Sequence, residues 1–460
     1  MMKVEKNNSE QIYRNAIAKY DRDLIEIYYK RGKTYLKLQD YTEAIKDFNI
    51  VLKLNPQDTK AYLIRGYTYG EIKQFNLEIA DYTKAISLSP KLAKAYRSRG
   101  YAYGILKSYD KAIADFTQAI ELNPSYTQAY YNRACTYNIL GEYSQALIDF
   151  NRVIELNPDN PCAYYHRGNL AQLLENNRQA IIDFTEVIRL NPDNAKAYSA
   201  RGNSNSILRH HHNAIIDYSQ AILLNPQDWQ SIYNQGNEYI NIKDYHNAVA
   251  SYNEVVRIQP KLASVYKDRA NTYGKLKNFD YAISDYTTSI KLNSDDSEAF
   301  YHRGNAHNFL QEYQKAIIDY DRCIALNPKH SSAYYNRGVT YSCLGQYREA
   351  IYNYDLAATI TPKSALIYNN RGNACKKLQK YKRAMADYTQ AIFYDSNYSD
   401  AYYNRGLVHY ILQEKQKSLK DLSLAAELFG KQGKRDLAEQ IADKIKSLHG
   451  VEQATGSSVQ

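Results

Sequence analysis

The pair Arg-Gly, or a close variant of it, returns along this chain at a constant interval, and this regularity limits the fold more than any other feature. The second residue of the pair is small and recurs at every 34th position, without insertion or deletion. These small residues are Gly32, Gly66, Gly100, Ala134, Gly168, Gly202, Gly236, Ala270, Gly304, Gly338, Gly372 and Gly406. A constant period of roughly 20 to 50 residues indicates a repeat architecture, in which each unit packs mainly against its neighbours. We therefore expect one array of twelve repeats, although 460 residues ordinarily suggest about three domains.

The other columns of the repeat are counted from the small residue. Tyrosine stands four residues before it in ten repeats, and leucine or isoleucine always stands six residues after it. Alanine stands twelve residues after it except at Glu78 and Ser418, and an aromatic residue stands sixteen after it except at Leu422. Apolar spacings of three and four predict two amphipathic helices of about 14 residues per repeat. In the first repeat these are Ile25–Leu38 and Thr42–Leu54.

Each column has a physical reason. The small residue and the alanine let the two helices of a repeat approach closely, and the aromatic ring packs between that pair and the next. Proline stands twenty-four residues after the small residue in nine repeats. Because proline lacks an amide hydrogen and disfavours helix in the residue before it, this column predicts the end of the second helix.

A column of arginines accompanies a column of aspartates. Arginine precedes the small residue in eleven repeats. Aspartate stands fifteen residues after the small residue at Asp47, Asp81, Asp115, Asp149, Asp183, Asp217, Asp285, Asp319, Asp387 and Asp421. The seventh repeat replaces both members, with Gln235 and Ser251, whereas the tenth keeps Arg337 opposite Asn353. A ligand-binding arginine ladder is one interpretation. We favour a partly buried ion pair that joins the two helices of each repeat, because buried charges need partners.

The order of Tyr, small residue, Ala, aromatic residue and Pro at these spacings resembles the tetratricopeptide repeat family over residues 24–430. The resemblance implies an all-α fold, an α-solenoid in which helix-turn-helix repeats form a right-handed superhelix. It also implies that the first helices line a concave groove that binds other proteins or peptides. The family usually has leucine where this chain has the arginine before the small residue.

The ends of the array are expected to be capped, because terminal repeats leave an apolar face uncovered. Residues 1–23 form an N-terminal segment in which Ser9–Tyr20 resembles half of a degraded repeat and is a candidate partial capping helix. Residues 431–450 contain Arg435–Leu448, which predicts a C-terminal capping helix. The small, polar residues 451–460 are expected to be a disordered tail.

Composition and motifs argue against catalysis, membrane insertion and metal binding. No phosphate-binding glycine loop, nucleophile motif or paired carboxylate motif is present, and no stretch of about 18 apolar residues that could span a bilayer. Cys135, Cys162, Cys323, Cys343 and Cys375 form no CxxC pair, which fits reduced thiols. We expect a soluble cytoplasmic protein that is not an enzyme and has no cofactor, no bound metal and no membrane span.

The predicted groove lining comes from the face of the first helix that lies opposite its packed face, which contains the positions six and two before the small residue and one and five after it. Two residues before the small residue stand Asn132, Asn234, Asn336, Asn370 and Asn404, and one residue after it stand Asn169, Asn203, Asn237, Asn271, Asn305 and Asn373. Three residues before it, tyrosine recurs at Tyr131, Tyr165, Tyr233, Tyr301 and Tyr335. The first repeats instead offer cations, including Lys60, Lys94 and Arg97.

Asparagine suits the recognition of an extended backbone, because a carboxamide both donates and accepts hydrogen bonds. Tyrosine adds apolar contact at a low entropic cost. In this respect the groove resembles the asparagine-lined solenoids of the O-linked N-acetylglucosamine transferases. The expected function is a protein-interaction scaffold or adaptor that holds an extended peptide in the groove, with an acidic segment of the partner near the N-terminal repeats.

Two alternatives remain at this point. Other helical-repeat solenoids bind nucleic acid, reading one base per repeat. Such a role predicts a basic groove throughout, whereas the net charge of +10 is spread over the chain and only the N-terminal third of the groove is basic, so no nucleic acid is expected. A bacterial effector that acts on host proteins is the other alternative, and it concerns biology that a sequence does not reveal.

Overall fold

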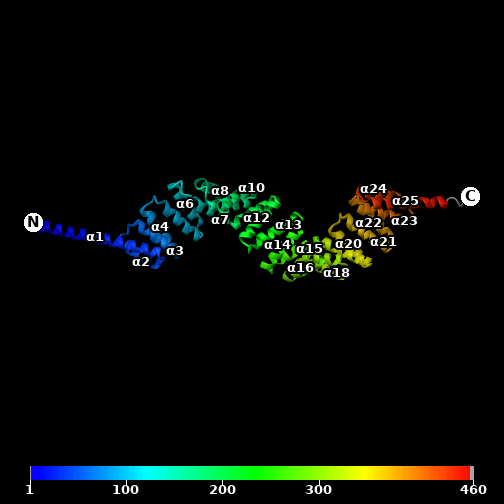
Figure 1. Cartoon of the computed structure of the whole chain (residues 1–460), viewed down its shortest axis with the longest axis horizontal. Coiled ribbons are helices and arrows are strands. Elements are labelled where there is room, and N and C mark those ends of the chain that lie inside the picture. Colours follow the sequence, from blue (N-terminus) through cyan, green and yellow to red (C-terminus); the bar gives the residue numbers. More distant parts are fainter. Residues whose placement is uncertain (1, 456–460) are drawn as a thin grey trace. The chain divides into compact units, whose positions relative to one another are not determined.

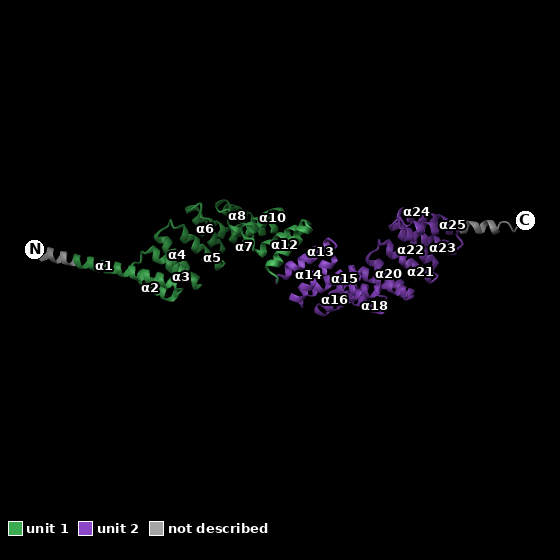
Figure 2. Cartoon of the chain, viewed as in Figure 1, with its two compact units in different colours: residues 1–226 green, residues 227–460 purple. Residues whose placement is uncertain are grey.

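The computed structural model describes residues 2–455, which form helices and no strand (Figure 1). They divide into two compact units, Met1–Pro226 and Gln227–Gln460 (Figure 2). The boundary falls in the connection between the sixth and seventh repeats. The expectation of an all-α solenoid built from paired helices is confirmed.

Helices alternate between the first and the second helix of each repeat, called here the A helix and the B helix. The helices of the first unit are α1 (Met2–Lys37), α2 (Tyr41–Leu54), α3 (Thr59–Glu71), α4 (Phe75–Leu88), α5 (Ala93–Ile105), α6 (Tyr109–Leu122), α7 (Thr127–Leu140), α8 (Tyr143–Leu156), α9 (Pro161–Leu173), α10 (Asn177–Leu190), α11 (Ala195–Ile207) and α12 (His211–Leu224). Odd-numbered helices up to α23 are A helices, and even-numbered ones are B helices.

The second unit continues the same alternation. Its helices are α13 (Trp229–Asn241), α14 (Tyr245–Ile258), α15 (Ala263–Lys275), α16 (Phe279–Leu292), α17 (Ser297–Phe309), α18 (Tyr313–Leu326), α19 (Ser331–Cys343), α20 (Tyr347–Ile360), α21 (Ala365–Lys377), α22 (Tyr381–Tyr394), α23 (Ser399–Ile411), α24 (Lys415–Lys431) and α25 (Arg435–Thr455). In the first repeat the A helix ends at Lys37 and the B helix runs from Tyr41 to Leu54. Each of these three bounds lies within one residue of the sequence prediction.

The two ends differ from each other. Residues 9–20, expected to cap the first repeat, are the start of α1, which runs without a break into the first A helix, and their side chains from Gln11 onward are mostly exposed. At the other end α25 packs on α24, where Ile441 joins Leu422, Ala425 and Phe429 in one buried cluster. Residues 451–455 of the expected disordered tail belong to α25, and residues 456–460 lie outside the described part of the chain.

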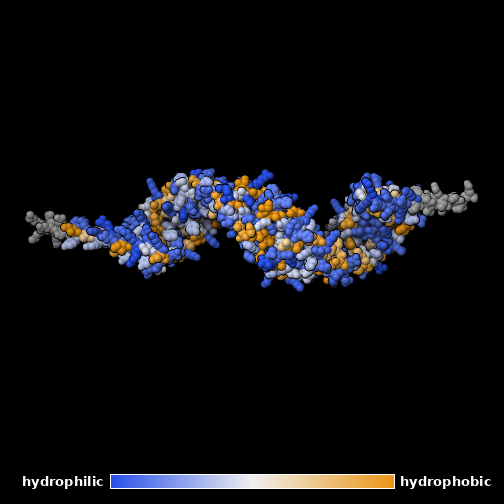
Figure 3. All heavy atoms as spheres, in the orientation of Figure 1, coloured by the Kyte–Doolittle hydropathy of each residue, from blue (hydrophilic) through white to orange (hydrophobic). Residues whose placement is uncertain are grey.

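The surface is a mixture of hydrophobic and hydrophilic groups over the face that Figure 3 shows. Of the described helices, none combines the length and the apolar character needed to cross a membrane.

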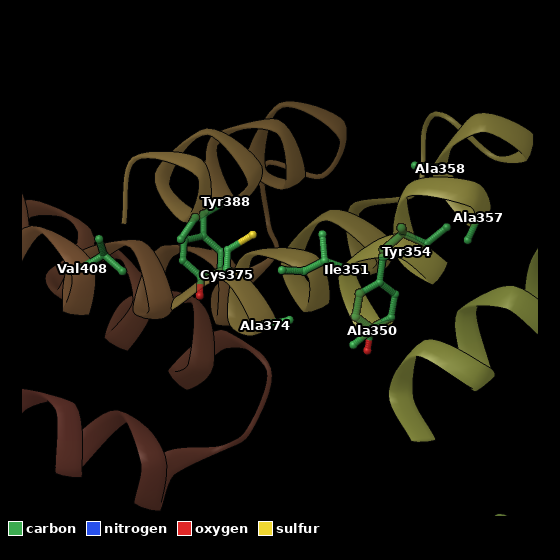
Figure 4. Close-up of a cluster of buried hydrophobic side chains, with 11 residues drawn as sticks. Ala350, Ile351, Tyr354, Ala357, Ala358, Ala374, Cys375, Tyr388 and Val408 are labelled. Carbon is green, nitrogen blue, oxygen red and sulfur yellow. The ribbon is translucent and has the colours of Figure 1, made fainter. Parts of the chain in front are cut away.

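Within a repeat, the small residue of the A helix lies against the aromatic ring of the B helix. A Cβ atom built on Gly236 would stand 2.7 Å from Cε1 of Tyr252, and one on Gly372 would stand 2.7 Å from Cε1 of Tyr388. Figure 4 shows this part of the tenth and eleventh repeats, where Tyr354 and Tyr388 are buried among small side chains such as Ala350 and Cys375. The small column therefore sets how closely the two helices approach, because ring and backbone share one narrow space.

The predicted ion pairs are present. In the fourth repeat Arg133 Nε donates to Asp149 Oδ2 at 2.8 Å and Nη2 donates to Oδ1 at 2.8 Å, so the contact is bidentate. The same pair joins A and B helices at Arg31–Asp47, Arg65–Asp81, Arg99–Asp115, Arg167–Asp183, Arg201–Asp217, Arg269–Asp285, Arg303–Asp319, Arg371–Asp387 and Arg405–Asp421. The aspartates are buried, and these ion pairs confirm that the two columns pair within a repeat wherever both residues are present.

The arginine also reaches the preceding repeat. Arg133 Nη1 donates to the hydroxyl of Thr117 on the preceding B helix at 2.8 Å, and the guanidinium lies 5.7 Å from the centroid of the Tyr130 ring. One side chain thus connects three helices. This third contact explains the tenth repeat, where Arg337 donates to Asn353 at 2.7 Å and takes its carboxylate partner, Asp321, from the preceding B helix.

Breaking this network at one repeat tests its contribution to stability. Arg133→Met leaves the Asp149 carboxylate buried without its charged partner, so we expect a loss of about 3 kcal/mol in the free energy of unfolding. The double change Arg133→Met with Asp149→Leu is expected to recover much of that loss. Urea unfolding of the full chain, followed by circular dichroism, measures both.

The control is Arg152→Met, which breaks the exposed pair between Arg152 and Glu155, for which we expect a change below about 0.5 kcal/mol. Equal stability of Arg133→Met and this control would show that the buried pair is dispensable.

Candidate functional site

Four cavities occupy the same place in different repeats, between the A helices of consecutive repeats. One lies between the second and third repeats in the first unit. The others lie between the seventh and eighth, the eighth and ninth, and the tenth and eleventh repeats of the second unit. Their volumes run from about 300 to about 460 Å³. Helical repetition has therefore produced a row of equivalent side-chain pockets.

The walls of all four cavities use the same positions, numbered here from the small residue. The first repeat of each pair supplies positions +1, +4 and +5 of its A helix and the aromatic residue at +16 of its B helix. The next repeat supplies positions −2, +1 and +5. Three of these positions, −2, +1 and +5, belong to the face that the sequence assigned to the groove. We call this surface, formed by those positions on the A helices of each unit, the A-helix face.

Most of the asparagines at +1 are oriented by a tyrosine hydroxyl from the B helix of the same repeat. The hydroxyl of Tyr286 donates to Oδ1 of Asn271 at 2.6 Å, and burial raises the pKa of Tyr286, which keeps the hydroxyl protonated. The same bond joins Tyr218 to Asn203, Tyr252 to Asn237, Tyr320 to Asn305 and Tyr388 to Asn373, at 2.7 to 2.8 Å. Asn169 is the exception among the +1 asparagines, since Phe184 stands opposite it.

The asparagines at −2 have a different task, which is to connect neighbouring repeats. Asn336 donates through Nδ2 to the hydroxyl of Tyr301 at 3.1 Å and to Oδ1 of Asn305 at 2.8 Å. Asn370 donates to the hydroxyl of Tyr335 in the same way. Asn404 donates to Asn369 at 3.2 Å and accepts from Lys376 Nζ at 2.9 Å.

The seventh and eighth repeats use a carboxylate for the same connection. Tyr233 donates its hydroxyl to Asp268, which occupies position −2 of the eighth repeat. Burial raises the pKa of the Asp268 carboxyl, and the hydrogen bond from Tyr233 opposes that shift. The hydroxyl groups of Tyr233, Tyr301 and Tyr335 therefore each form a hydrogen bond with the residue at −2 of the next A helix.

Other predicted groove residues lie on A helices but outside the four cavities. Asn132, Asn169, Asn203, Asn234, Tyr131 and Tyr165 are half-buried on α7, α9, α11 and α13. Tyr131 and Tyr165 pack edge-on against Phe150 and Phe184, at 6.1 and 5.8 Å between ring centroids. Lys60 and Lys94 are exposed in the first turns of α3 and α5, whereas Arg97 lines the cavity between the second and third repeats.

Several cavity residues were not anticipated from the sequence. Lys275 and Lys377 line cavities of the second unit, and although their position, +5, was assigned to the groove face, neither residue was named as a candidate. Phe279 and Phe309 stack with centroids 4.9 Å apart at the cavity between the eighth and ninth repeats, although Phe309 is largely exposed. The sequence made no prediction for position +9, where Phe279 stands. This position lies just after the turn, where helical periodicity does not indicate which way a side chain points.

The cavity of the first unit contains a buried carboxylate. Glu78 stands at +12, where ten repeats have alanine, and only 6 % of it is exposed. Burial, with the nearby charge of Glu71, raises the pKa of Glu78 to about 7. The residue therefore titrates near neutral pH in a cavity that Tyr67, Phe75, Tyr82 and Tyr101 line together with the charged residues Glu71, Lys73 and Arg97.

No metal site accompanies these cavities. In the part of the chain that the structure describes, no group of three His, Cys, Asp or Glu side chains could hold a metal ion.

Paired helices in tandem, with one type of cavity repeated along one face, define a helical-repeat solenoid. Sequence models described as tetratricopeptide repeat or TPR repeat match residues 25–58, 59–92, 93–126, 127–160, 163–194, 195–228, 230–262, 297–330, 319–352, 343–379 and 372–413. The chain belongs to the tetratricopeptide repeat family, a family of protein-interaction scaffolds that is generally non-catalytic.

Solved structures of the same class are similar to parts of the chain. MamA is 27% identical over 38% of this chain and 94% of its own, with a TM-score of 0.35. YrrB, described as a TPR protein with an unusual peptide-binding site, is 22% identical over 39% of this chain and 92% of its own, with a TM-score of 0.37. A tetratricopeptide repeat protein from Parabacteroides merdae is 20% identical over 55% of this chain and 98% of its own, with a TM-score of 0.43. A search of curated protein sequences found no match.

The buried carboxylate makes the stability of the chain depend on pH. An unfolded glutamate ionises near pH 4.5, whereas Glu78 in the fold ionises near 7, so stability is lost as pH rises between these values. Glu78→Gln removes this dependence. We expect the variant to match the wild type at pH 4 and to be more stable at pH 8, by on the order of 3 kcal/mol.

Urea unfolding at the two pH values measures the difference. The control is Glu121→Gln on α6, whose side chain is exposed, and it should keep the pH dependence of the wild type. A Glu78→Gln variant with the same pH dependence as the wild type would contradict the assignment.

Proposed function

We propose that this protein is an interaction scaffold that holds an extended peptide segment of a partner protein against the A-helix face. The observation that carries the proposal is the set of three equivalent cavities in the second unit, each with an asparagine at its edge that a tyrosine hydroxyl orients. Asn271 lines two successive cavities. Asn237 lines the first of these two cavities together with Asn271, and Asn305 lines the second. An extended peptide matches such a row, since its side chains leave the backbone at regular intervals and its amides need partners.

The geometry makes Asn305 a hydrogen-bond donor toward a ligand. Oδ1 of Asn305 accepts from the Tyr320 hydroxyl and from Nδ2 of Asn336, so both of its acceptor positions are used within the protein. The amino group of the same carboxamide remains as the group that a ligand carbonyl can bind. This narrows the expectation from sequence that each carboxamide both donates and accepts. An orientation fixed before binding also reduces the entropy lost when the peptide binds.

The cavities supply selectivity, because their charges differ. Asp268 and Lys275 line the cavity between the seventh and eighth repeats, whereas Lys377 is the charged residue of the cavity between the tenth and eleventh. The asparagines thus bind backbone groups of any sequence, and the cavities favour particular side chains.

Removal of the asparagine donors tests the proposal. The triple change Asn237→Ala, Asn271→Ala and Asn305→Ala removes three donors, each of which contributes about 1 kcal/mol in a typical hydrogen bond. We expect the affinity for a peptide bound at this face to fall by on the order of 100-fold. The probe is a dodecapeptide selected on the full chain from a random phage-displayed library, and its affinity is measured by fluorescence anisotropy.

A second triple variant, with Phe in place of Tyr252, Tyr286 and Tyr320, serves as the matched control. It keeps the asparagines and removes only the hydroxyls that orient them, and Phe150 and Phe184 show that the column tolerates phenylalanine. We expect a smaller loss of affinity than for the asparagine variant. If the asparagine variant remains folded by circular dichroism and binds every selected peptide as tightly as the wild type, the A-helix face is not the binding surface.

A further inference from the structure

Glu78 is an exception to the alanine column in the second repeat, and Gly70 faces it. At +12 an alanine normally packs, fully buried, against the A helix, as Ala112 and Ala282 do. Glu78 is much larger, and Gly70 on the facing A helix makes room for it, because a Cβ atom on Gly70 would stand 2.9 Å from Cδ and from Oε2 of Glu78. The glycines at the same place in the third and eighth repeats, Gly104 and Gly274, have no atom within 4 Å of such a Cβ.

The carboxylate of Glu78 forms no hydrogen bond or ion pair with the described residues, although the residue as a whole is nine-tenths buried. Arg97 lines the same cavity of about 350 Å³ without pairing with it, and the buried Nε of Arg97 also lacks a partner. A buried polar group without a partner destabilises a fold, and more so when it is charged. An acceptor and a donor left open in one cavity indicate a ligand that supplies the complementary groups.

The walls specify the chemistry of that ligand. Tyr67, Phe75 and Tyr101 line the cavity, and Glu71 stands at its edge close enough to Glu78 to act on its charge. A cation on an apolar stem fits such a place, because aromatic faces attract cations and a carboxylate at the inner end forms a charge-assisted hydrogen bond. Lys73 and Arg97 are the cations that line the cavity, and neither forms an ion pair with Glu78.

The second unit contains a comparison cavity of nearly the same construction. Between the eighth and ninth repeats, Gly274, Phe279 and Tyr286 repeat Gly70, Phe75 and Tyr82. That cavity has Ala282 where Glu78 stands and Lys275 where Glu71 stands. The aromatic walls are therefore common to both cavities. Of the two, only the cavity between the second and third repeats has the pair of carboxylates.

We propose that the cavity between the second and third repeats binds a lysine or arginine side chain of the partner, with its cationic group on Glu78 and its stem along the aromatic walls. The proposal rests on the proposed function, because it places this side chain on a segment bound to the A-helix face. Arg97 then donates to a backbone carbonyl of the same segment. This assigns a basic residue to a region where the sequence, from Lys60, Lys94 and Arg97, suggested an acidic one.

The test uses single-residue probes, so it does not depend on the asparagines. N-acetyl-lysine methylamide, N-acetyl-norleucine methylamide and N-acetyl-glutamate methylamide are titrated against the full chain by saturation-transfer difference NMR. We expect the lysine probe to bind at least tenfold more tightly than the norleucine probe. In Glu78→Ala, which restores the residue that ten repeats have at this position, the two probes should bind equally, while the norleucine probe is unaffected.

Each result has one meaning. Equal binding of lysine and norleucine to the wild type, or a lysine preference that survives in Glu78→Ala, overturns the assignment. Preferential binding of the glutamate probe overturns it in favour of an anion site at Arg97. If the lysine preference depends on Glu78 but selected peptides bind independently of Asn237, Asn271 and Asn305, the cavity assignment holds and the proposed binding face fails.

Discussion

The contact between the small residue of the A helix and the aromatic ring of the B helix is the constraint on which the rest of the repeat depends. A Cβ atom on Gly202 would stand 2.8 Å from Tyr218, so the ring and the backbone occupy adjoining space with no room between them. This close approach brings Arg201 against Asp217 on the neighbouring positions. It also places the hydroxyl of Tyr218 where it donates a hydrogen bond to Oδ1 of Asn203. A packing contact in the core therefore positions both the ion pair and the A-helix face.

The arginine network extends this order from one repeat to the next. A typical arginine of the column binds its aspartate in two places and reaches the preceding B helix with its remaining nitrogen, as Arg303 does with Asp319 and Thr287. A planar guanidinium with donors in a fixed fork suits this arrangement better than a lysine ammonium. The tenth repeat shows that the charge can come from either side, since Asp321 compensates for Asn353. Solenoid stability is a sum of repeat and interface terms, and this one residue contributes to both.

Against such a regular framework, departures from a column mark places with a different role. Leu422 replaces the aromatic residue in the last repeat, where α25 covers the array. Glu78 departs from the alanine column and introduces a carboxylate into an otherwise repeated cavity. The first departure is explained by the end of the array, whereas the second has no structural partner. The difference between the two is what turns an irregularity into a candidate binding site.

The sequence by itself determined the fold class, the number of repeats and the pairing of the arginine and aspartate columns, because each follows from contacts repeated at one period. It did not reveal the backbone conformation of the turn between the two helices, since residues such as Lys107 and Arg209 adopt positive φ there without being glycine. Nor did it show that Tyr286 fixes Asn271, that Asn336 connects two repeats, or that Gly70 makes room for Glu78. Those relations join residues on different helices, and only the packing of the helices decides which side chains meet. Periodicity determines which face a residue lies on, whereas tertiary structure decides what that residue touches.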